Sequence, residues 1–304
     1  MNPHRPPLRI LVCTKMDLAG ALILNTLLPR LADCKVMVLM SEKTRPVENT
    51  VPELAEIKFY ERDLPVDILF PLLDRAEVGR GEAPRARLET FAALSARYGI
   101  TIESITDLNG PDGEARIRAF APDLTISARF SLIFKPNTYD IPPLGTYNIH
   151  PGALPRYAGL FAPFRCMLDG SDAIGCTLHR VDKGIDTGPI VGIGYLPVDR
   201  SRSLLWHVVN TYRPGLDLFL AMLDGLRQGR EPQYAVQDFS QRQYVSLPGA
   251  EPFADFRAKG LKLFEPNEYL EILSGFLPPD MAMPSAVARA VNNGRGDPCC
   301  SAPA

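Results

Sequence analysis

An amide and an imidazole lie two residues apart in the segment Thr146–His150, TYNIH, and a proline follows directly. In an extended strand, residues i and i+2 project to the same face, so Asn148 and His150 point together at the carboxyl end of the strand. Pro151 has no N–H for the ladder and Gly152 relaxes the backbone, so we expect the chain to leave the sheet here. The segment therefore presents two polar groups at the edge where open α/β sheets bind ligands.

An amide and an imidazole that face one point suit acyl transfer. Attack on a carbonyl develops negative charge on oxygen, which an asparagine N–H can stabilise, and the attacking group loses a proton that a histidine can accept. A carboxylate is the usual group that orients such a ring and stabilises its charged form. The segment Val181–Pro189, VDKGIDTGP, offers two candidates: Asp186, which lies between two glycines, and Asp182, which is nearer in sequence.

Each of these residues also has a structural interpretation. A pair such as Asn148 and His150 at a strand end is more often held by local hydrogen bonds, and an aspartate in a glycine-rich loop is often a turn residue. His179 could line the site or could be a half-buried structural histidine. A zinc site of His150, His179 and Asp186 is conceivable, but the sequence has no closely spaced pair of histidines, and we predict no metal.

Short apolar runs alternate with helical patterns over the first 228 residues. Apolar runs without polar alternation are typical of central strands in a parallel sheet that is covered on both faces. We therefore expect an α/β fold, with an open, mostly parallel, Rossmann-like sheet, helices on both faces and a small C-terminal appendage. The predicted strands are 8–13, 35–40, 100–105, 123–128, 145–150, 174–181 and 189–198. The predicted helices are 18–31, 86–98, 112–120, 160–169 and 203–226, the last interrupted or kinked at Pro214-Gly215.

The predicted domain organisation has three parts. Residues 1–228 form one catalytic domain, and residues 229–280 form a small appendage that packs on the core. The appendage contains a short amphipathic helix with Phe253 and Phe256 on its apolar face and Gly260 at its end. Residues 281–304 are rich in Ala, Asn, Gly and Pro and are predicted to be a disordered tail.

The charge balance excludes several classes of function. Lys and Arg number 33 against 35 Asp and Glu, so the chain has no net positive charge that would attract it to nucleic acid or to an anionic membrane.

Other features of the sequence narrow the class of protein. The first apolar run is short and is followed by Lys15, so we expect no signal peptide and a cytoplasmic protein. The turn Cys13–Gly20 has a single glycine, which argues against dinucleotide cofactors. The 6 cysteines are scattered and are expected to be free thiols.

Two longer stretches carry a resemblance. LGTYNIHPGALPRYAG, at 144–159, contains Asn-x-His-Pro-x-x-Leu-Pro-x-x-x-Gly, and GCTLHRVDKGIDTGPIV, at 175–191, contains Asp-x-Gly-x-Asp-Thr-Gly-Pro. In this order the motifs resemble those of the folate-dependent formyltransferase family, and the similarity is clear from about residue 120 to residue 198. The resemblance implies an N-formyltransferase that moves a formyl group from 10-formyltetrahydrofolate to a primary amine.

The resemblance also implies roles for particular residues. It identifies Asn148 as the oxyanion donor, His150 as the group that moves the proton, and Asp186 as the carboxylate that holds and polarises His150 or a water. It implies no metal. The residues that it assigns to the formyl-folate pocket are Arg129, Phe130, Ser131, Leu132, Ile133, Asp182 and Gly184.

The acceptor is expected to be a small-molecule amine, such as an amino-sugar nucleotide or an amino-acid derivative, rather than tRNA. Initiator-tRNA formyltransferases carry a basic β-barrel after the core, whereas residues 230–304 contain 7 Lys and Arg against 9 Asp and Glu. Three alternatives remain: a formyltetrahydrofolate hydrolase that uses the same residues, an enzyme like methionyl-tRNA formyltransferase, and a folate binder without turnover. Release of formate without an added amine would indicate the hydrolase.

Overall fold

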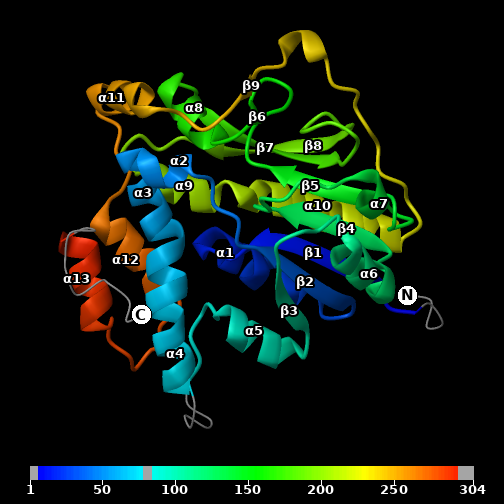
Figure 1. The fold of residues 1–304 in the computed structure, drawn as a ribbon, viewed down its shortest axis with the longest axis horizontal. Coiled ribbons are helices and arrows are strands. Elements are labelled where there is room, and N and C mark those ends of the chain that lie inside the picture. The colour runs from blue at the N-terminus through cyan, green and yellow to red at the C-terminus, as the bar shows by residue number, and fades with distance from the viewer. Residues whose placement is uncertain (1–5, 78–83, 294–304) are drawn as a thin grey trace.

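A seven-stranded sheet forms the centre of the computed structural model, which describes residues 6–77 and 84–293 (Figure 1). Across the sheet the strands are β3 (Thr101–Ile105), β2 (Lys35–Ser41), β1 (Arg9–Lys15), β4 (Leu124–Ala128), β5 (Thr146–His150), β7 (Ala173–Arg180) and β8 (Ile190–Pro197). The first five run parallel, whereas β7 is antiparallel to β5 and β8 is antiparallel to β7. The predicted open, mostly parallel α/β sheet is confirmed.

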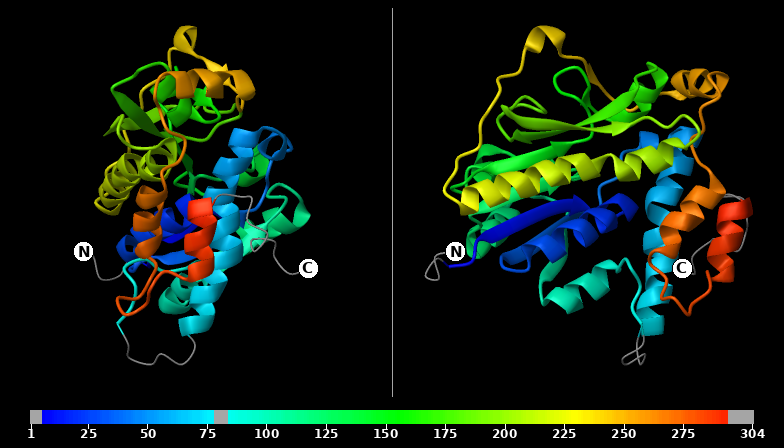
Figure 2. Two further views of the ribbon diagram at one scale, coloured as in Figure 1. Left: turned by 90° about the vertical axis from the view of Figure 1, so that its left-hand side faces the viewer. Right: turned by 180° about the vertical axis from the view of Figure 1, so that it is seen from behind.

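Helices cover both faces of this sheet (Figure 2). They are α1 (Leu18–Leu27), α2 (Val47–Thr50), α3 (Pro52–Lys58), α4 (Phe70–Glu77), α5 (Phe91–Tyr98), α6 (Pro111–Phe120), α7 (Pro136–Tyr139), α8 (Ala162–Leu168), α9 (Leu204–Asn210), α10 (Tyr212–Arg227), α11 (Ala250–Ala258), α12 (Pro266–Ser274) and α13 (Ser285–Asn293). A π-helical segment, Phe59–Leu69, joins α3 to α4. Two short strands, β6 (Ala158–Gly159) and β9 (Tyr244–Val245), pair in parallel outside the main sheet.

Strand β1 shows why the central strands have continuous apolar runs. Ile10 and Val12 belong to the core on the face covered by α1 and α10, whereas Leu11 and Cys13 pack with Ile117 of α6 on the other face. All four strand side chains are 1% exposed or less. Because both faces are buried, neither set of alternating positions can be polar.

The break in the predicted helix 203–226 lies at Thr211, not at Pro214-Gly215. Pro214 lies in the first turn of α10, where its missing N–H removes no bond within the helix. Gly215 allows α10 to approach the sheet closely, because a Cβ at this position would lie 2.4 Å from the Ile149 side chain and 2.6 Å from Cys176 Sγ.

The helices between residues 47 and 77 were not predicted from the sequence. They pack against the C-terminal part of the chain, and the views of Figures 1 and 2 agree on this arrangement. The Tyr60 ring stacks on Phe264 with 3.7 Å between centroids, and the Tyr269 hydroxyl donates to the Tyr60 carbonyl. Contacts with residues some 200 positions away hold this segment, so no local pattern indicates it.

The C-terminal part departs from one prediction. Disorder over residues 281–304 is wrong for Ser285–Asn293, which form α13, because Val287, Ala290 and Val291 are at helical spacing and lie buried in the main core. Residues 294–304, with Cys299 and Cys300, are outside the described residues. The predicted amphipathic helix is confirmed as α11, with Phe253 and Phe256 fully buried and Gly260 at φ +72°. The domain division at residue 228 stays a prediction.

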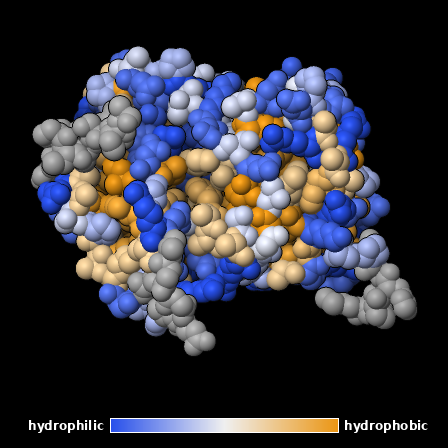
Figure 3. Space-filling model, turned by 60° about the horizontal axis from the view of Figure 1, so that its bottom comes forward, coloured by the Kyte–Doolittle hydropathy of each residue, from blue (hydrophilic) through white to orange (hydrophobic). Residues whose placement is uncertain are grey.

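The surface is mixed in character. On the face shown in Figure 3, hydrophilic side chains surround smaller apolar areas. Within residues 6–77 and 84–293, no helix has the length and apolar character needed to cross a membrane. Of the six cysteines, the four in the described part, Cys13, Cys34, Cys166 and Cys176, are free thiols.

Candidate active site

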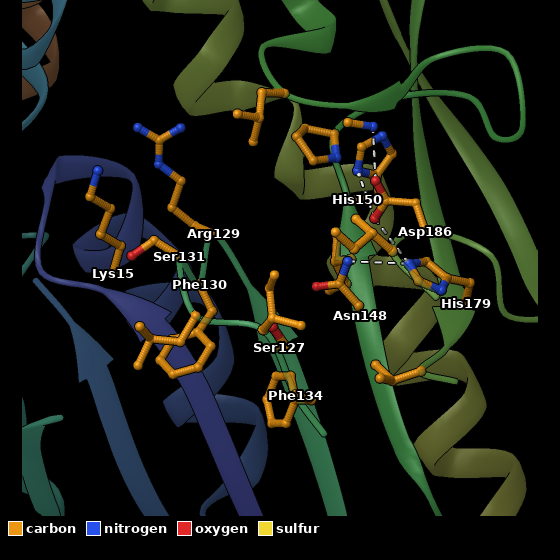
Figure 4. A pocket seen from close by; sticks show the side chains of 18 of the residues that line it. Lys15, Ser127, Arg129, Phe130, Ser131, Phe134, Asn148, His150, His179 and Asp186 are labelled. Atoms are coloured by element: carbon orange, nitrogen blue, oxygen red, sulfur yellow. Dashed lines mark hydrogen bonds and ion pairs between the residues drawn. The ribbon is translucent and has the colours of Figure 1, made fainter. Parts of the chain in front are cut away.

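A pocket of about 280 Å³ lies at the carboxyl ends of β1, β4 and β5, where the sequence predicts the site. Figure 4 shows Lys15, Arg129, Phe130 and Ser131 on one side of it and Asn148, His150, His179 and Asp186 on the other. All ten residues that the sequence analysis assigns to the site line this pocket: Asn148, His150, Asp186, Arg129, Phe130, Ser131, Leu132, Ile133, Asp182 and Gly184. Their roles stay predictions.

His150 ends β5 and is 4% exposed. Its Nε2 lies 2.6 Å from the Tyr157 carbonyl oxygen. Because a carbonyl can only accept, Nε2 carries a proton and donates it, which leaves Nδ1 as the acceptor nitrogen of the neutral ring. Nδ1 lies 3.6 Å from Oδ1 of Asp186. The turn by which the chain leaves β5 after His150 depends on Gly152, because a Cβ at this position would lie 2.6 Å from the Tyr157 carbonyl oxygen.

Asp186 lies against His150, whereas Asp182 does not. The Asp186 backbone has φ +55°, and Gly159 N–H donates to its Oδ2 at 2.9 Å. Burial opposes ionisation of Asp186, but the positive charge of the His150 ring when it is protonated and the Gly159 N–H outweigh it and hold the pKa of this carboxyl below its ordinary value. Asp182 instead accepts from Gly184 N–H at 3.0 Å and from the Thr187 hydroxyl at 2.5 Å, so it shapes the loop.

His179 pairs directly with Asn148 across the antiparallel strands β5 and β7. Its Nδ1 lies 3.0 Å from the Arg180 carbonyl oxygen, so Nδ1 carries the proton. Nε2 therefore accepts from the Asn148 amide, 3.2 Å away. Burial lowers the pKa of His179, which favours this neutral form. One amide N–H of Asn148 is thus fixed, and the carboxamide keeps a second N–H at the pocket.

Arg129 follows β4 and faces two carboxylates. Its Nε lies 2.9 Å from Asp17 Oδ2, and its Nη2 lies 2.6 Å from Glu61 Oε2. Although burial opposes it, Glu61 and Asp17 hold the pKa of Arg129 well above its ordinary value. The ion pairs fix Arg129 as part of the pocket wall, and neither acidic partner is predicted from the sequence.

The segment 130–133 forms an apolar wall with polar backbone groups. Phe130 and Leu132 pack beside Phe134, whose ring centroid lies 5.6 Å from that of Phe130. Ser131 hydrogen-bonds Ser41 through its hydroxyl at 2.8 Å. Ile133 is 60% exposed at the mouth of the pocket. A slot of this kind, with aromatic walls and a few fixed polar groups, suits a flat heteroaromatic ring.

Lys15 was not predicted as a site residue. It ends β1, its side chain is 9% exposed, and it lines the pocket beside Arg129. Its charge interacts with that of Glu61, but no hydrogen bond or ion pair joins its ammonium to a residue of 6–77 or 84–293. Its position at the carboxyl end of the first strand, the edge at which such sheets bind ligands, is the feature of the sequence that indicates a site residue.

Among residues 6–77 and 84–293, no group of three His, Cys, Asp or Glu side chains is placed to hold a metal ion.

Known proteins are similar to this chain over the range that contains the site. The family model described as formyl transferase matches residues 76–205. The chain is 37% identical over 118 residues to the methionyl-tRNA formyltransferase of Pelobacter propionicus, and 31% identical over 168 residues to that of Trichlorobacter lovleyi. Residues 76–205 are therefore similar to the formyl transferase family. Both motifs and the residues Asn148, His150 and Asp186 lie inside the matched range.

The matched relatives are similar over only part of their length. The two alignments cover 38% and 55% of this chain, and 37% and 53% of the relatives. Solved structures extend the likeness in fold beyond residues 76–205. A 4-N formyltransferase from Francisella tularensis superposes with a TM-score of 0.51 over 90% of both chains at 16% identity. An N-formyltransferase from Helicobacter canadensis gives 0.50 over 79% of this chain and 71% of that one, at 17% identity.

Proposed function

We propose that this chain transfers a formyl group from 10-formyltetrahydrofolate to a primary amine. One observation carries the proposal: Asn148, His150 and Asp186 converge on one pocket, inside the range that matches the formyl transferase family. The Helicobacter canadensis structure, similar in fold, is described as a complex with folinic acid and dTDP-3-aminofucose. Phe130 and Phe134 line the pocket, and their rings suit contact with the flat ring of the donor.

The contacts of the three residues suggest how the reaction proceeds. The second N–H of Asn148 donates to the formyl oxygen, where negative charge develops as the amine attacks the carbonyl carbon. His150 accepts the proton of the attacking amine at Nδ1, and the ionised Asp186 stabilises the imidazolium. His150 then gives this proton to the folate nitrogen as the bond from carbon to that nitrogen breaks. The new amide carries the formyl group, and tetrahydrofolate leaves with the proton.

Hydrolysis of the donor is the competing activity, because water could take the place of the amine at the same three residues. Lys15, on the opposite side of the pocket from His150, favours an acceptor larger than water, because it offers a charge to an anionic group of that acceptor. A transferase releases little formate until its acceptor is present, whereas a hydrolase releases formate without it.

We infer that the acceptor is a small molecule with an anionic group. Lys15 supports this inference, because its nearly buried ammonium has no hydrogen bond or ion pair among the described residues and suits a phosphate or carboxylate oxygen. Amino-sugar nucleotides and amino-acid derivatives both carry such groups. The curated relatives act on methionyl-tRNA by their names, so a tRNA acceptor is one outcome that the experiment must separate.

The test is incubation of the purified chain with 10-formyltetrahydrofolate and a panel of acceptors. The panel contains amino-sugar nucleotides, amino-acid derivatives, methionyl initiator tRNA and a control without amine. Mass spectrometry detects formyl adducts, and a coupled assay detects formate. We expect a formyl adduct with an anionic small molecule. Formate in every tube and no adduct would indicate a hydrolase, and an adduct on tRNA alone would contradict the small-molecule acceptor.

A further inference from the structure

A C-terminal segment crosses the outside of the loop that carries Asp186. This segment, residues 234–247, is called the strap here, and it lies after α10 in the chain (yellow in Figure 1). At one end Ala235 exchanges two backbone hydrogen bonds of 2.8 Å with Ile190. At the other end the Val245 carbonyl accepts from Leu160 N–H at 2.8 Å. The strap is thus fixed on both sides of the Asp186 loop.

Side chains of the strap hold three carbonyl groups of the Asp186 loop. Gln237 Nε2 donates to the carbonyls of Asp186 at 3.1 Å and Gly188 at 2.7 Å. Arg242 Nη2 donates to the Ile185 carbonyl at 2.9 Å. These bonds surround the one residue of the loop with a left-handed backbone and a side chain, Asp186 at φ +55°. Such a conformation is unfavourable for a residue with a Cβ and persists only where its surroundings fix it.

The orientation of the Gln237 carboxamide follows from its partners. Both partners are carbonyls, which only accept, so the NH₂ group must face them. The Gln237 side chain is 6% exposed, and its Oε1 is buried without a hydrogen-bond partner among the described residues. Burying an amide oxygen without a hydrogen bond destabilises the fold. Only the two bonds donated by the NH₂ group offset this cost, so the role of Gln237 lies in these bonds.

We propose that Gln237 is a positioning residue for Asp186: its two donated hydrogen bonds hold the loop so that the carboxylate faces His150. Gln237 lies outside residues 76–205, so the range that matches the formyl transferase family depends on a later residue of the chain for the geometry of its site. Gly159 takes part in the same arrangement, because it pairs with the strap residue Val245 and donates to Asp186. The inference rests on the proposed function for its effect on turnover, but not for its effect on the loop.

The matched variants are Gln237→Met and Gln241→Met. Methionine has nearly the length of glutamine but no N–H, so Gln237→Met removes both bonds with little change in volume. Gln241 lies on the same strap and is exposed, and among the described residues its side chain bonds only Asp238. It therefore controls for the substitution itself.

The first measurement is hydrogen exchange of the full chain, followed by mass spectrometry of peptides that cover residues 156–190. We expect faster exchange in this region for Gln237→Met, including the Gly159 amide, and no change for Gln241→Met. This experiment needs no formyl donor. It therefore tests whether Gln237 stabilises the Asp186 loop even if the wild-type chain transfers no formyl group. Equal exchange in wild type and Gln237→Met would overturn the proposal.

The second measurement is the turnover of Gln237→Met in the wild-type and Asp186→Asn backgrounds. We expect kcat to fall about tenfold in the wild-type background, the scale of a lost buried hydrogen bond, with the KM for the donor little changed. If Gln237 acts through Asp186, its loss in Asp186→Asn has an effect below about twofold. Equal losses of kcat in both backgrounds would contradict a positioning role. An unchanged kcat in Gln237→Met, together with faster hydrogen exchange of the loop, would also contradict it.

Discussion

The Asn148 amide donates to Nε2 of His179, 3.2 Å away on the neighbouring antiparallel strand. His179 in turn donates from Nδ1 to the Arg180 carbonyl, so its protonation state and the direction of the Asn148 amide depend on each other. The asparagine therefore reaches the pocket already oriented, with one N–H bound to protein and one available to a substrate oxygen. Orientation before binding is what makes an oxyanion donor effective.

This relationship predicts different effects for two substitutions of His179. Glutamine offers an oxygen that can accept from Asn148, whereas leucine offers none. We expect kcat to fall about tenfold in His179→Leu, on the scale of a lost buried hydrogen bond, and much less in His179→Gln. Steady-state kinetics of formyl transfer measure this, with thermal unfolding as the control for folding. Equal losses in the two variants would show that His179 does not act through Asn148.

Asp186 predicts how stability changes with pH. Its pKa is lowered in the folded chain, where burial opposes the shift and the charge of the protonated His150 ring and the Gly159 N–H outweigh it. As pH falls, the unfolded chain therefore takes up this proton first, and the stability due to ionised Asp186 is lost as pH falls through the folded pKa. We expect the free energy of unfolding to fall more steeply in wild type than in Asp186→Asn from about pH 5 to about pH 3. Urea unfolding at several pH values tests this, and parallel curves would contradict it.

Lys15 predicts where an anionic acceptor binds. Lys15→Met removes the ammonium but keeps the chain, so we expect the KM for the acceptor to rise about tenfold, the scale of a lost charge-assisted hydrogen bond, with the KM for formyl-folate unchanged. The exposed Lys43 provides the matched control, Lys43→Met. A rise in the donor's KM instead would place the folate, rather than the acceptor, at Lys15.

Arg129 predicts an effect on stability. It is the cation that pairs with both Asp17 and Glu61, and the side chain of Asp17 is fully buried. Arg129→Met leaves these carboxylates without that partner, so we expect a loss of about 3 kcal/mol in the free energy of unfolding. Arg118→Met removes an exposed pair with Glu114 and should change it by less than about 1 kcal/mol. Urea unfolding compares the two, and equal effects would show that the buried pairs add no special stability.

Much of the fold follows from local patterns in the sequence. Runs such as Leu8–Cys13 indicate central strands because both of their faces are buried, and the alternation of strands and helices indicates a parallel sheet. The helices between 47 and 77 were not predictable in this way. Tyr60 packs on Phe264 and Tyr269, so the partners that stabilise the segment lie far away in the chain.

The candidate site was predictable to different degrees. Asn148 and His150 follow from the two-residue period of a strand. The contact between Asn148 and His179 depends on the pairing register of two antiparallel strands, which neither segment specifies alone. The backbone of Asp186 and the support from Gln237 depend on a strap some 50 residues away, and no local pattern indicates that contact.

The most direct test of the account is the formation of a formyl adduct by wild type and Asn148→Ala under the same conditions. With 10-formyltetrahydrofolate and the acceptor found in the panel, we predict an adduct in wild type and turnover reduced about a hundredfold in Asn148→Ala, the scale of one lost oxyanion donor. Circular dichroism and thermal unfolding should show the same fold in both. A near-normal turnover number in Asn148→Ala, with the fold intact, would contradict the assignment of this site.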